Sequence, residues 1–316
     1  MVKVVIFTPR YMHLSPVSFL ESDFPYYTGL SPKGKRKFLR RLSRILNSKI
    51  FIGCEGLEMT NYIRYYIASA WVTLTFGLEE YITHEFTQVH VYPDTFYSEQ
   101  VQSYVKGLTT GKGIIFLSWH DFIEDYKVAN NLNVGLHELT HAILISAAFK
   151  SNFDDHFSGY YHEFFMNTKD DFVNLRLGNP SYLRKYGGTN MVEFLSVCVE
   201  CFFERPAELK EKMPVLYYNL CVLFRQNPIN TTKDYKVDKH IVREIKASYL
   251  DHGIPDYILN QYSRPIFLKL LIRFTFPLTV LAFILFGSTG NPIFGALGVA
   301  GVSHMLIRFA KMVGEQ

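Results

Sequence analysis

Asn133-Val-Gly-Leu-His-Glu-Leu-Thr-His-Ala-Ile-Leu-Ile145 is a strongly apolar stretch of this 316-residue chain, and it contains the pentad His137-Glu138-Leu139-Thr140-His141. We predict that this stretch forms a buried helix. Residues four positions apart share one face of a helix, so His137 and His141 can bind one metal ion while Glu138 stands beside them. The pentad therefore indicates a zinc peptidase. The alternative is a chance match whose histidines make ordinary hydrogen bonds in a core.

A third metal ligand is expected on a second helix, because a catalytic zinc ion takes three protein ligands and keeps one position open. Glu193 is the candidate. It begins the apolar run Glu193-Phe-Leu-Ser-Val-Cys-Val-Glu-Cys-Phe-Phe-Glu204, in which Glu193, Glu200 and Glu204 recur along one helical face. An ordinary solvated acidic stripe has the same pattern, so composition alone leaves both interpretations open.

Four separated blocks carry a resemblance to a known family. They are Lys49-Ile-Phe-Ile-Gly-Cys-Glu-Gly-Leu57, Gly113-Ile-Ile-Phe-Leu-Ser-Trp119, the block from Asn133 to His141, and Val192-Glu-Phe-Leu-Ser-Val-Cys-Val-Glu-Cys-Phe-Phe-Glu-Arg-Pro206. A tail from Pro214 to Pro228 also fits. Residues 28 to 230 thereby resemble the zinc-dependent peptidases typified by Mlc titration factor A, a gluzincin group whose catalytic core is similar to that of anthrax lethal factor.

The resemblance implies roles for particular residues. It implies that Glu193 is the third Zn²⁺ ligand and that Tyr186, seven residues earlier, faces the metal. We then expect Glu138 to act as the general base on a zinc-activated water and Tyr186 to donate a hydrogen bond to the oxyanion. The alternative that Tyr186 is only a packing aromatic in a loop stays open. Glu200 is expected to orient a ligand histidine through a hydrogen bond to the ring nitrogen that does not bind the metal. The family likeness also implies aminopeptidase-like action on short peptides.

The chain departs from the family pattern after the pentad. Leu144 stands where the family commonly carries an aspartate, and the segment 149–172 is rebuilt with its own acids and histidines. These are Asp154, Asp155, His156, His162 and Glu163. They can supply substitute contacts near the metal, but a solvated surface loop is the interpretation that we favour.

The predicted fold class is α+β, a mainly helical zincin-type domain with a small sheet. We expect helices at 33–47, 59–75, 133–149, 191–203 and 215–225, and strands at 88–92 and 114–119. The strand at 114–119 precedes the active helix. As an edge strand it would hold an extended peptide by backbone pairing.

The domain boundaries follow from where apolar sequence concentrates. We predict a zinc metallopeptidase domain with its linker over residues 1–262, the linker being 234–264, and a membrane hairpin over residues 263–316. The stretch 266–286 is long enough to cross a bilayer, and 293–309 is marginal. The alternative is a pair of buried helices on the catalytic domain.

Flanking charges predict the orientation of the hairpin and the location of the protein. Lys269 and Arg273 lie at its entry and Arg308 and Lys311 at its exit, so the positive-inside rule places both ends and the catalytic domain in the cytoplasm. The start of the chain has no secretory signal pattern. Four cysteines fit a reducing compartment, and Cys198-Val-Glu-Cys201 is expected to be buried packing rather than a redox pair.

Net charge is +4, and one basic cluster dominates it. The cluster consists of Lys33, Lys35, Arg36, Lys37, Arg40, Arg41 and Arg44, with no acid between them. A solvated helix face is the favoured interpretation, contact with anionic lipid is a second, and nucleic acid is an unlikely partner.

The sequence therefore predicts a membrane-anchored zinc-dependent peptidase with a peptide or protein as substrate. Two other classes stay open. The chain can be a membrane-held binding protein that sequesters a transcription regulator or another partner, with a structural zinc site, because the typical family member is named for binding a transcriptional repressor. It can also be a structural membrane protein with an inert soluble part.

Overall fold

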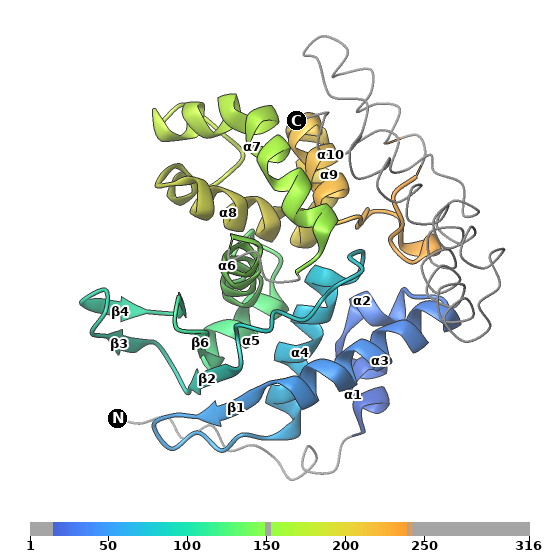
Figure 1. Cartoon of the computed structure of the whole chain (residues 1–316), viewed down its shortest axis with the longest axis vertical. Coiled ribbons are helices and arrows are strands. Elements are labelled where there is room, and N and C mark those ends of the chain that lie inside the picture. The colour runs from blue at the N-terminus through green and yellow to red at the C-terminus, as the bar shows by residue number, and fades with distance from the viewer. Residues whose placement is uncertain (1–14, 149–152, 239–240, 242–316) are drawn as a thin grey trace, which may run out of the picture. The chain divides into compact units, whose positions relative to one another are not determined.

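A computed structural model describes residues 15–148, 153–238 and 241, all of them within the first of two compact units, Met1–Asp251 (Figure 1). Its α-helices are α1 (Pro16–Asp23), α2 (Pro25–Thr28), α3 (Pro32–Ser48), α4 (Asn61–Thr75), α5 (Trp119–Lys127), α6 (Val134–Ala148), α7 (Asp155–Arg176), α8 (Met191–Glu204), α9 (Pro206–Lys212) and α10 (Pro214–Leu223). Two short 3₁₀ helices are η2 (Lys185–Gly188) and η3 (Thr231–Lys233). The strands are β1 (Ile50–Gly53), β2 (Gln88–Tyr92), β3 (Phe96–Ser98), β4 (Ser103–Val105), β5 (Gly107–Thr110) and β6 (Ile114–Ser118). The predicted α+β class, mainly helical with a small sheet, is confirmed.

The main sheet has four strands in the order β1-β2-β6-β5. β1, β2 and β6 run parallel, with Val89 opposite Phe51 on one side and Ile115 on the other. β5 pairs antiparallel with β6 and lies at the end of the sheet. β3 and β4 form a separate two-stranded hairpin that projects from the body of the domain in Figure 1.

Helix α6 lies in the middle of the described fold (Figure 1). It contacts the sheet through β5 and β6, and it contacts helices α4 and α8. Its residues are apolar all round, which is typical of a helix that is buried between layers. The helix that carries the pentad is thus held by both the sheet and the C-terminal helices.

Local sequence explains where the two helices of the pentad and of Glu193 begin. The Asn133 side chain accepts a hydrogen bond from Leu136 N at 2.9 Å, which caps the first turn of α6. Asn190 accepts hydrogen bonds from Val192 N and Glu193 N and so begins α8. Asparagine is among the preferred N-cap residues because its carbonyl satisfies amide groups that the first helical turn leaves free.

The expected helices and strands all form, with end points that move by up to two residues. Two interpretations of these elements were wrong. The strand at 114–119 is not an edge strand, because β6 is paired on both sides and β5 takes the edge. The acids and histidines after residue 153 do not form a loop, because Asp154 caps helix α7 and the others lie on it; Asp154 and His156 are buried, whereas Asp155 and His162 are exposed.

The expected linker also begins later than predicted. Asp234 accepts hydrogen bonds from the Ser31 amide and hydroxyl at the start of α3, at 2.6 and 2.8 Å. The Tyr235 ring stacks on Tyr26 at 4.0 Å and is 5 % exposed. These residues are therefore part of the packed domain, because a backbone segment tied down by buried contacts does not act as a free connection.

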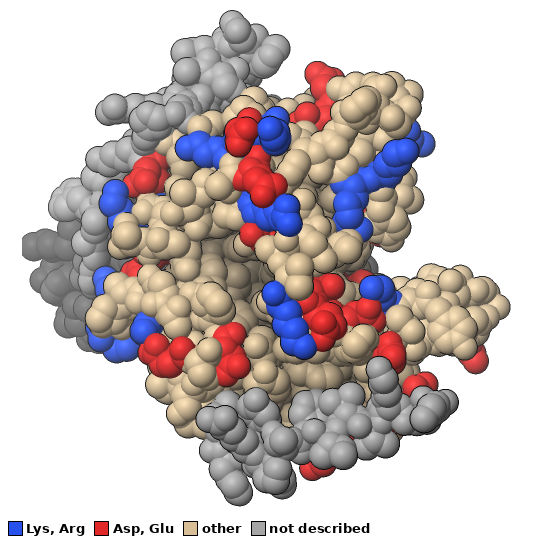
Figure 2. Space-filling model, turned by 180° about the vertical axis from the view of Figure 1, so that it is seen from behind, with Lys and Arg blue, Asp and Glu red and all other residues tan. Residues whose placement is uncertain are grey.

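The predicted membrane hairpin, residues 263–316, lies outside the described residues. Within 15–148, 153–238 and 241, no helix is long and apolar enough to cross a bilayer. Among the described residues of the face shown in Figure 2, basic and acidic side chains are interspersed. That face therefore carries no extended field of one sign.

Candidate metal centre

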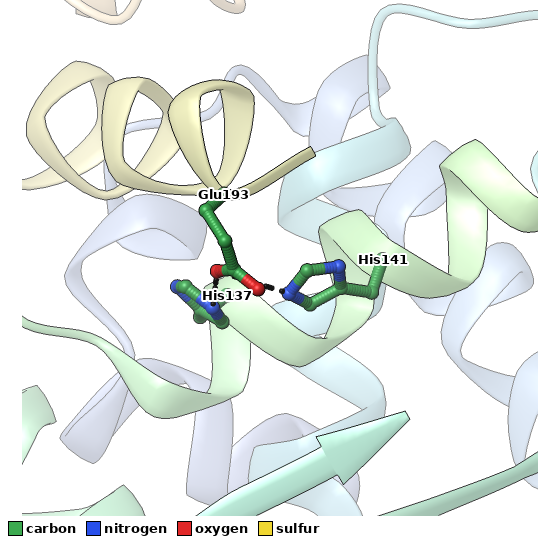
Figure 3. Close-up of side chains that lie close together, drawn as sticks. All are labelled: His137, His141 and Glu193. Atoms are coloured by element: carbon green, nitrogen blue, oxygen red, sulfur yellow. Dashed lines mark ion pairs between the residues drawn. The ribbon is translucent and has the colours of Figure 1, made fainter. Parts of the chain in front are cut away.

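Three predicted ligand residues come together between α6 and α8 (Figure 3). His137 Nε2 lies 2.9 Å and His141 Nε2 3.5 Å from the same carboxylate oxygen, Glu193 Oε2. One ligand atom from each residue lies within 4.8 Å of the others. The pitch of α6 places the two imidazoles on one face, and α8 begins just above them.

These distances fit a bound metal ion. Zinc bonds of about 2.0–2.1 Å in a tetrahedral arrangement place neighbouring ligand atoms roughly 3.3 Å apart. Glu193 Oε2 is buried and has no hydrogen-bond partner of acceptable geometry among the described residues, although two imidazole nitrogens lie beside it. An acceptor that is buried in this way requires a cation, because an unpaired buried charge is costly. Two imidazoles and one carboxylate therefore fit a divalent metal ion at this place.

Charges around the ligands are strongly coupled. Burial lowers the pKa of His137, but the carboxylates of Glu193 and Glu200, which lie 2.9 and 2.7 Å from its ring nitrogens, outweigh that effect and raise the pKa to about 10. Burial alone would raise the pKa of Glu193, but His137 and His141 hold it well below the usual range of a carboxyl group. The site is thus built for a charged carboxylate beside a positive partner, which is a proton or a metal ion.

Glu200 lies behind His137 and is 1 % exposed. Its Oε1 accepts a hydrogen bond from His137 Nδ1 at 2.7 Å, which leaves Nε2 to face Glu193 and the metal position. Arg184 donates to both carboxylate oxygens of Glu200 at 2.6 and 2.7 Å, and the amide of Asn133 donates to Oε2 at 2.9 Å. Glu200 therefore fixes both the tautomer and the orientation of His137.

Glu138, the neighbour of His137 on α6, lies against strand β5. The Thr109 hydroxyl lies 2.8 Å from Glu138 Oε2 and 2.9 Å from the Glu138 backbone oxygen. At Gly107 a Cβ atom would lie 2.5 Å from Glu138 Cγ, so only glycine lets the strand approach this closely. Burial raises the pKa of Glu138, and His141, His137 and Thr109 offset part of the rise. Glu138 is therefore a held carboxylate whose pKa is moved toward the range of a general base.

Tyr186 lies on η2 at the open side of the site. Its ring centroid is 5.9 Å from that of His137, and the residue is 50 % exposed. Burial and the charges of Glu193 and Glu138 raise its pKa to about 12, so it stays a hydrogen-bond donor at neutral pH. Because Gly188 has no side chain, η2 can pack closely on α7. A Cβ atom at this position would lie 3.0 Å from the Arg176 backbone.

The structure thus brings together all six predicted site residues, namely His137, Glu138, His141, Tyr186, Glu193 and Glu200. The solvated-stripe interpretation is wrong for Glu200, which is buried, and for Glu204, which accepts hydrogen bonds from the amides of Asn130 and Asn131. Leu144, which stands at the family's aspartate position, is 5 % exposed and belongs to the core.

Sequence reasoning missed two polar residues that hold the site, Arg184 and Thr109. A buried Glu200 requires a cation, and that requirement points to the loop before Tyr186, where Arg184 stands. Thr109 has no comparable signal, because its contact with Glu138 arises only when β5 pairs with β6. Cys198 and Cys201 are buried and unpaired, and burial raises the pKa of Cys201 to about 12, which agrees with packing rather than redox chemistry.

Comparison with known proteins gives one family and several relatives. Residues 9–225 match the family model of the glucose-regulated metallo-peptidase M90. The protein slr2042 of Synechocystis is 26 % identical over 232 residues, which cover 67 % of this chain and 84 % of that protein. Mlc titration factor A of Klebsiella pneumoniae is 24 % identical over 233 residues, covering 66 % and 86 %, and that of Yersinia pestis is 23 % identical over 233 residues, covering 68 % and 86 %.

Proposed function

The chain belongs to the glucose-regulated metallo-peptidase M90 family, and on this basis we propose that it is a zinc-dependent peptidase. The observation that carries the proposal is the convergence of His137, His141 and Glu193 on one point beside the held carboxylate of Glu138. Two imidazoles and one carboxylate are the ligand set of a catalytic zinc ion with an open fourth position. When bound, zinc would acidify a water molecule and polarise the scissile carbonyl.

Glu138 is the proposed general base. Thr109 occupies Glu138 Oε2, so Oε1 is the oxygen that takes the proton from the attacking water and delivers it to the leaving amine. The raised pKa of Glu138 suits this exchange, because a base works best when its pKa approaches the working pH.

Tyr186 is the proposed oxyanion donor. It keeps its proton at neutral pH, and it stands at the open side of the ligand set, beside Glu193 and His137. A donor at this place would stabilise the negative charge that develops on the carbonyl oxygen of the peptide.

Strand β5 is the proposed site of peptide pairing. It lies at the end of the sheet, with β6 as its strand neighbour, and its residues Gly107 and Thr109 touch Glu138. An extended peptide that adds to this edge gains backbone hydrogen bonds and has its bonds aligned beside the catalytic carboxylate. We propose aminopeptidase-like action on short peptides on the strength of the family likeness.

The test compares hydrolysis by three forms of the full chain, which are the wild type, Glu138→Gln and Glu211→Gln. Short chromogenic peptides serve as substrates, and zinc content is measured on the same samples. We expect Glu138→Gln to keep zinc and to lose about 10²–10⁴-fold in turnover, because it removes a proton acceptor and no ligand. Glu211 is an exposed acid paired with Lys212, so its variant should match the wild type. Equal turnover of Glu138→Gln and the wild type would contradict the proposal.

A second candidate function is the binding of a regulatory protein. The observation that favours it is the projecting β3–β4 hairpin, on which Val101, Tyr97 and Tyr104 are 46, 51 and 73 % exposed. Exposed tyrosines are enriched in protein interfaces. The relatives from Klebsiella pneumoniae and Yersinia pestis carry the name Mlc titration factor A, which suggests Mlc as the first partner to try. Pull-down with Glu138→Gln separates the candidates, because a binding role survives the loss of hydrolysis.

We also propose that the hairpin over residues 263–316 anchors the chain in the cytoplasmic membrane with the catalytic domain on the cytoplasmic side. The support is its apolar sequence and the flanking basic residues. Membrane fractions washed with carbonate should retain the full chain, and detergent should release it. Recovery of the chain in the carbonate wash would contradict the anchoring.

A further inference from the structure

A basic pocket of about 590 Å³ lies at the N-terminal half of α3. Six cationic side chains line it: Lys33, Arg36, Lys37 and Arg40 from α3, Arg225 from the segment after α10, and Lys236 from the segment after η3. Among the lining residues that the structure describes, Asp234 is the one acid, so these residues carry six positive charges and one negative, a net of +5. The volume suits a small ligand.

The four cations on α3 form one row along the helix. Positions 33, 36, 37 and 40 follow the i, i+3, i+4, i+7 spacing that places side chains on a single face. Arg36 and Arg40 are exposed and stand four residues apart, where like charges destabilise a helix by a few tenths of a kcal/mol, about 0.2–0.5. The stability of the helix therefore gives no reason for this row.

Acidic partners do not neutralise the pocket. The two carboxylate oxygens of Asp234 are engaged by the Ser31 amide and hydroxyl, and Arg225 is paired with Glu79 outside the lining. Within the described part of the chain, Lys33, Arg36, Arg40 and Lys236 form no ion pair with an acid. Lys35, on the same helix but outside the pocket, is paired with Glu21 at 2.8 Å. These four cations of the pocket are thus left without an acidic partner among the described residues and can take an anion.

Lys37 is the half-buried member of the row, whereas Lys33, Arg36 and Arg40 are exposed. Its Nζ donates to the Phe76 backbone oxygen at 2.6 Å and sits 4.4 Å from the centre of the Phe76 ring. Burial, together with the charges of Arg41, Arg40 and Lys236, lowers its pKa to about 8. An anion in the pocket would remove this repulsion, which is a gain beyond the direct contacts.

We propose that this pocket binds a multivalent phosphate group, carried either by a small soluble metabolite or by the headgroup of an anionic lipid. Arginine forks and lysine ammonium groups are the side chains that recognise phosphate oxygens, and several of them from separate segments converge here. None of the lining residues comes from α6, α8 or η2, so this site is distinct from the metal centre.

The test is calorimetric titration of the full chain with tripolyphosphate at low ionic strength, together with flotation on vesicles of phosphatidylglycerol and phosphatidylcholine. We expect saturable binding that weakens with added salt and at least about tenfold in the double variant Arg36→Gln/Arg40→Gln, since one charge-assisted hydrogen bond is worth about a factor of ten. The double variant Lys35→Gln/Lys127→Gln removes the same charge from ion-paired residues outside the pocket and should bind like the wild type.

The two binding measurements distinguish a soluble phosphate compound from a lipid headgroup, and together they can contradict the proposal. Binding of tripolyphosphate indicates a soluble ligand, and flotation that depends on Arg36 and Arg40 without tripolyphosphate binding indicates a lipid headgroup. Thermal melting without ligand checks the fold, and Lys236→Gln, an exposed residue from another segment, serves as a second probe. Absence of both kinds of binding, or equal loss in the control variant, would overturn the proposal.

Discussion

Arg184 has its effect on the metal centre through Glu200. Glu200 is buried against His137, and Arg184 supplies a cation for its buried carboxylate. Loss of one partner from a buried pair is strongly destabilising, because the other charge remains in a medium that solvates it poorly. The pair therefore maintains the orientation of a ligand that Arg184 does not touch.

The first prediction follows from this chain of contacts. Arg184→Gln should lower zinc affinity about 10 to 100-fold, as measured by competition with a chromophoric chelator, because the support of His137 is weakened. Lys185→Gln changes a neighbouring exposed cation and should leave the affinity unchanged. Equal affinities of the two variants would contradict the role of Arg184.

Glu204 gives a prediction about pH. Burial raises its pKa from 4.5 to about 7, and hydrogen bonds from Asn133, Asn131 and Asn130 offset part of the rise. Because the pKa of Glu204 is higher in the folded than in the unfolded state, its contribution to the free energy of unfolding is fully present below about pH 4.5. That contribution is lost as the pH rises through about 7. Glu204→Gln should therefore be more stable relative to the wild type at pH 8 than at pH 4. Urea unfolding across this range measures the difference, and a constant difference would contradict the shift.

Strand β5 carries the contacts that place Glu138. Gly107→Ala adds a Cβ atom at 2.5 Å from Glu138 Cγ, so either the strand or the carboxylate must move. We expect zinc content to be kept and turnover to fall by about tenfold or more, because small displacements of a catalytic group are costly. Gly111→Ala, in the turn between β5 and β6, meets nothing within 4 Å and is the matched control. A loss of the same size in both variants would indicate a general effect on the strand.

Prediction from sequence succeeded for elements that carry their own signals. α3, α4, α6 and α8 begin at capping residues, α10 is a nearly continuous apolar run that begins with proline, and β2 alternates its burial along the strand. α7 was mistaken for a loop because its acids and histidines suggest solvent, whereas His156 and Asp154 are buried by packing on distant segments. β5 was missed because Gly-Leu-Thr-Thr becomes a strand only by pairing with β6.

The residues of the candidate site also differ in how far the sequence alone predicted them. His137, Glu138 and His141 are four residues or fewer apart on one helix, so helical geometry alone brings them together. Glu193 was expected from its helical run and from the family likeness, and Tyr186 from the likeness alone. The support from Arg184 and Thr109 depends on how α8, η2 and β5 pack around α6. Contacts between segments far apart in sequence leave little local trace.

Metal removal tests the domain as one folded unit. The site joins α6 to α8, and without a cation the carboxylate of Glu193 is buried beside His137 and His141. Chelation should therefore lower the Tm of the catalytic unit, and added zinc should raise it in proportion to the logarithm of free zinc. Differential scanning calorimetry of the full chain measures this. A metal-free preparation with unchanged Tm would favour an inert soluble part.

Zinc titration of the metal-free full chain, with hydrolysis of short chromogenic peptides followed in the same samples, tests the central claim most directly. The account predicts turnover that rises with zinc and saturates at one zinc ion per chain in the wild type, with neither tight zinc binding nor turnover in Glu193→Ala. A chain that takes up zinc through these residues and hydrolyses none of the peptides would contradict the peptidase function, and a chain that takes up no zinc would contradict the metal centre itself.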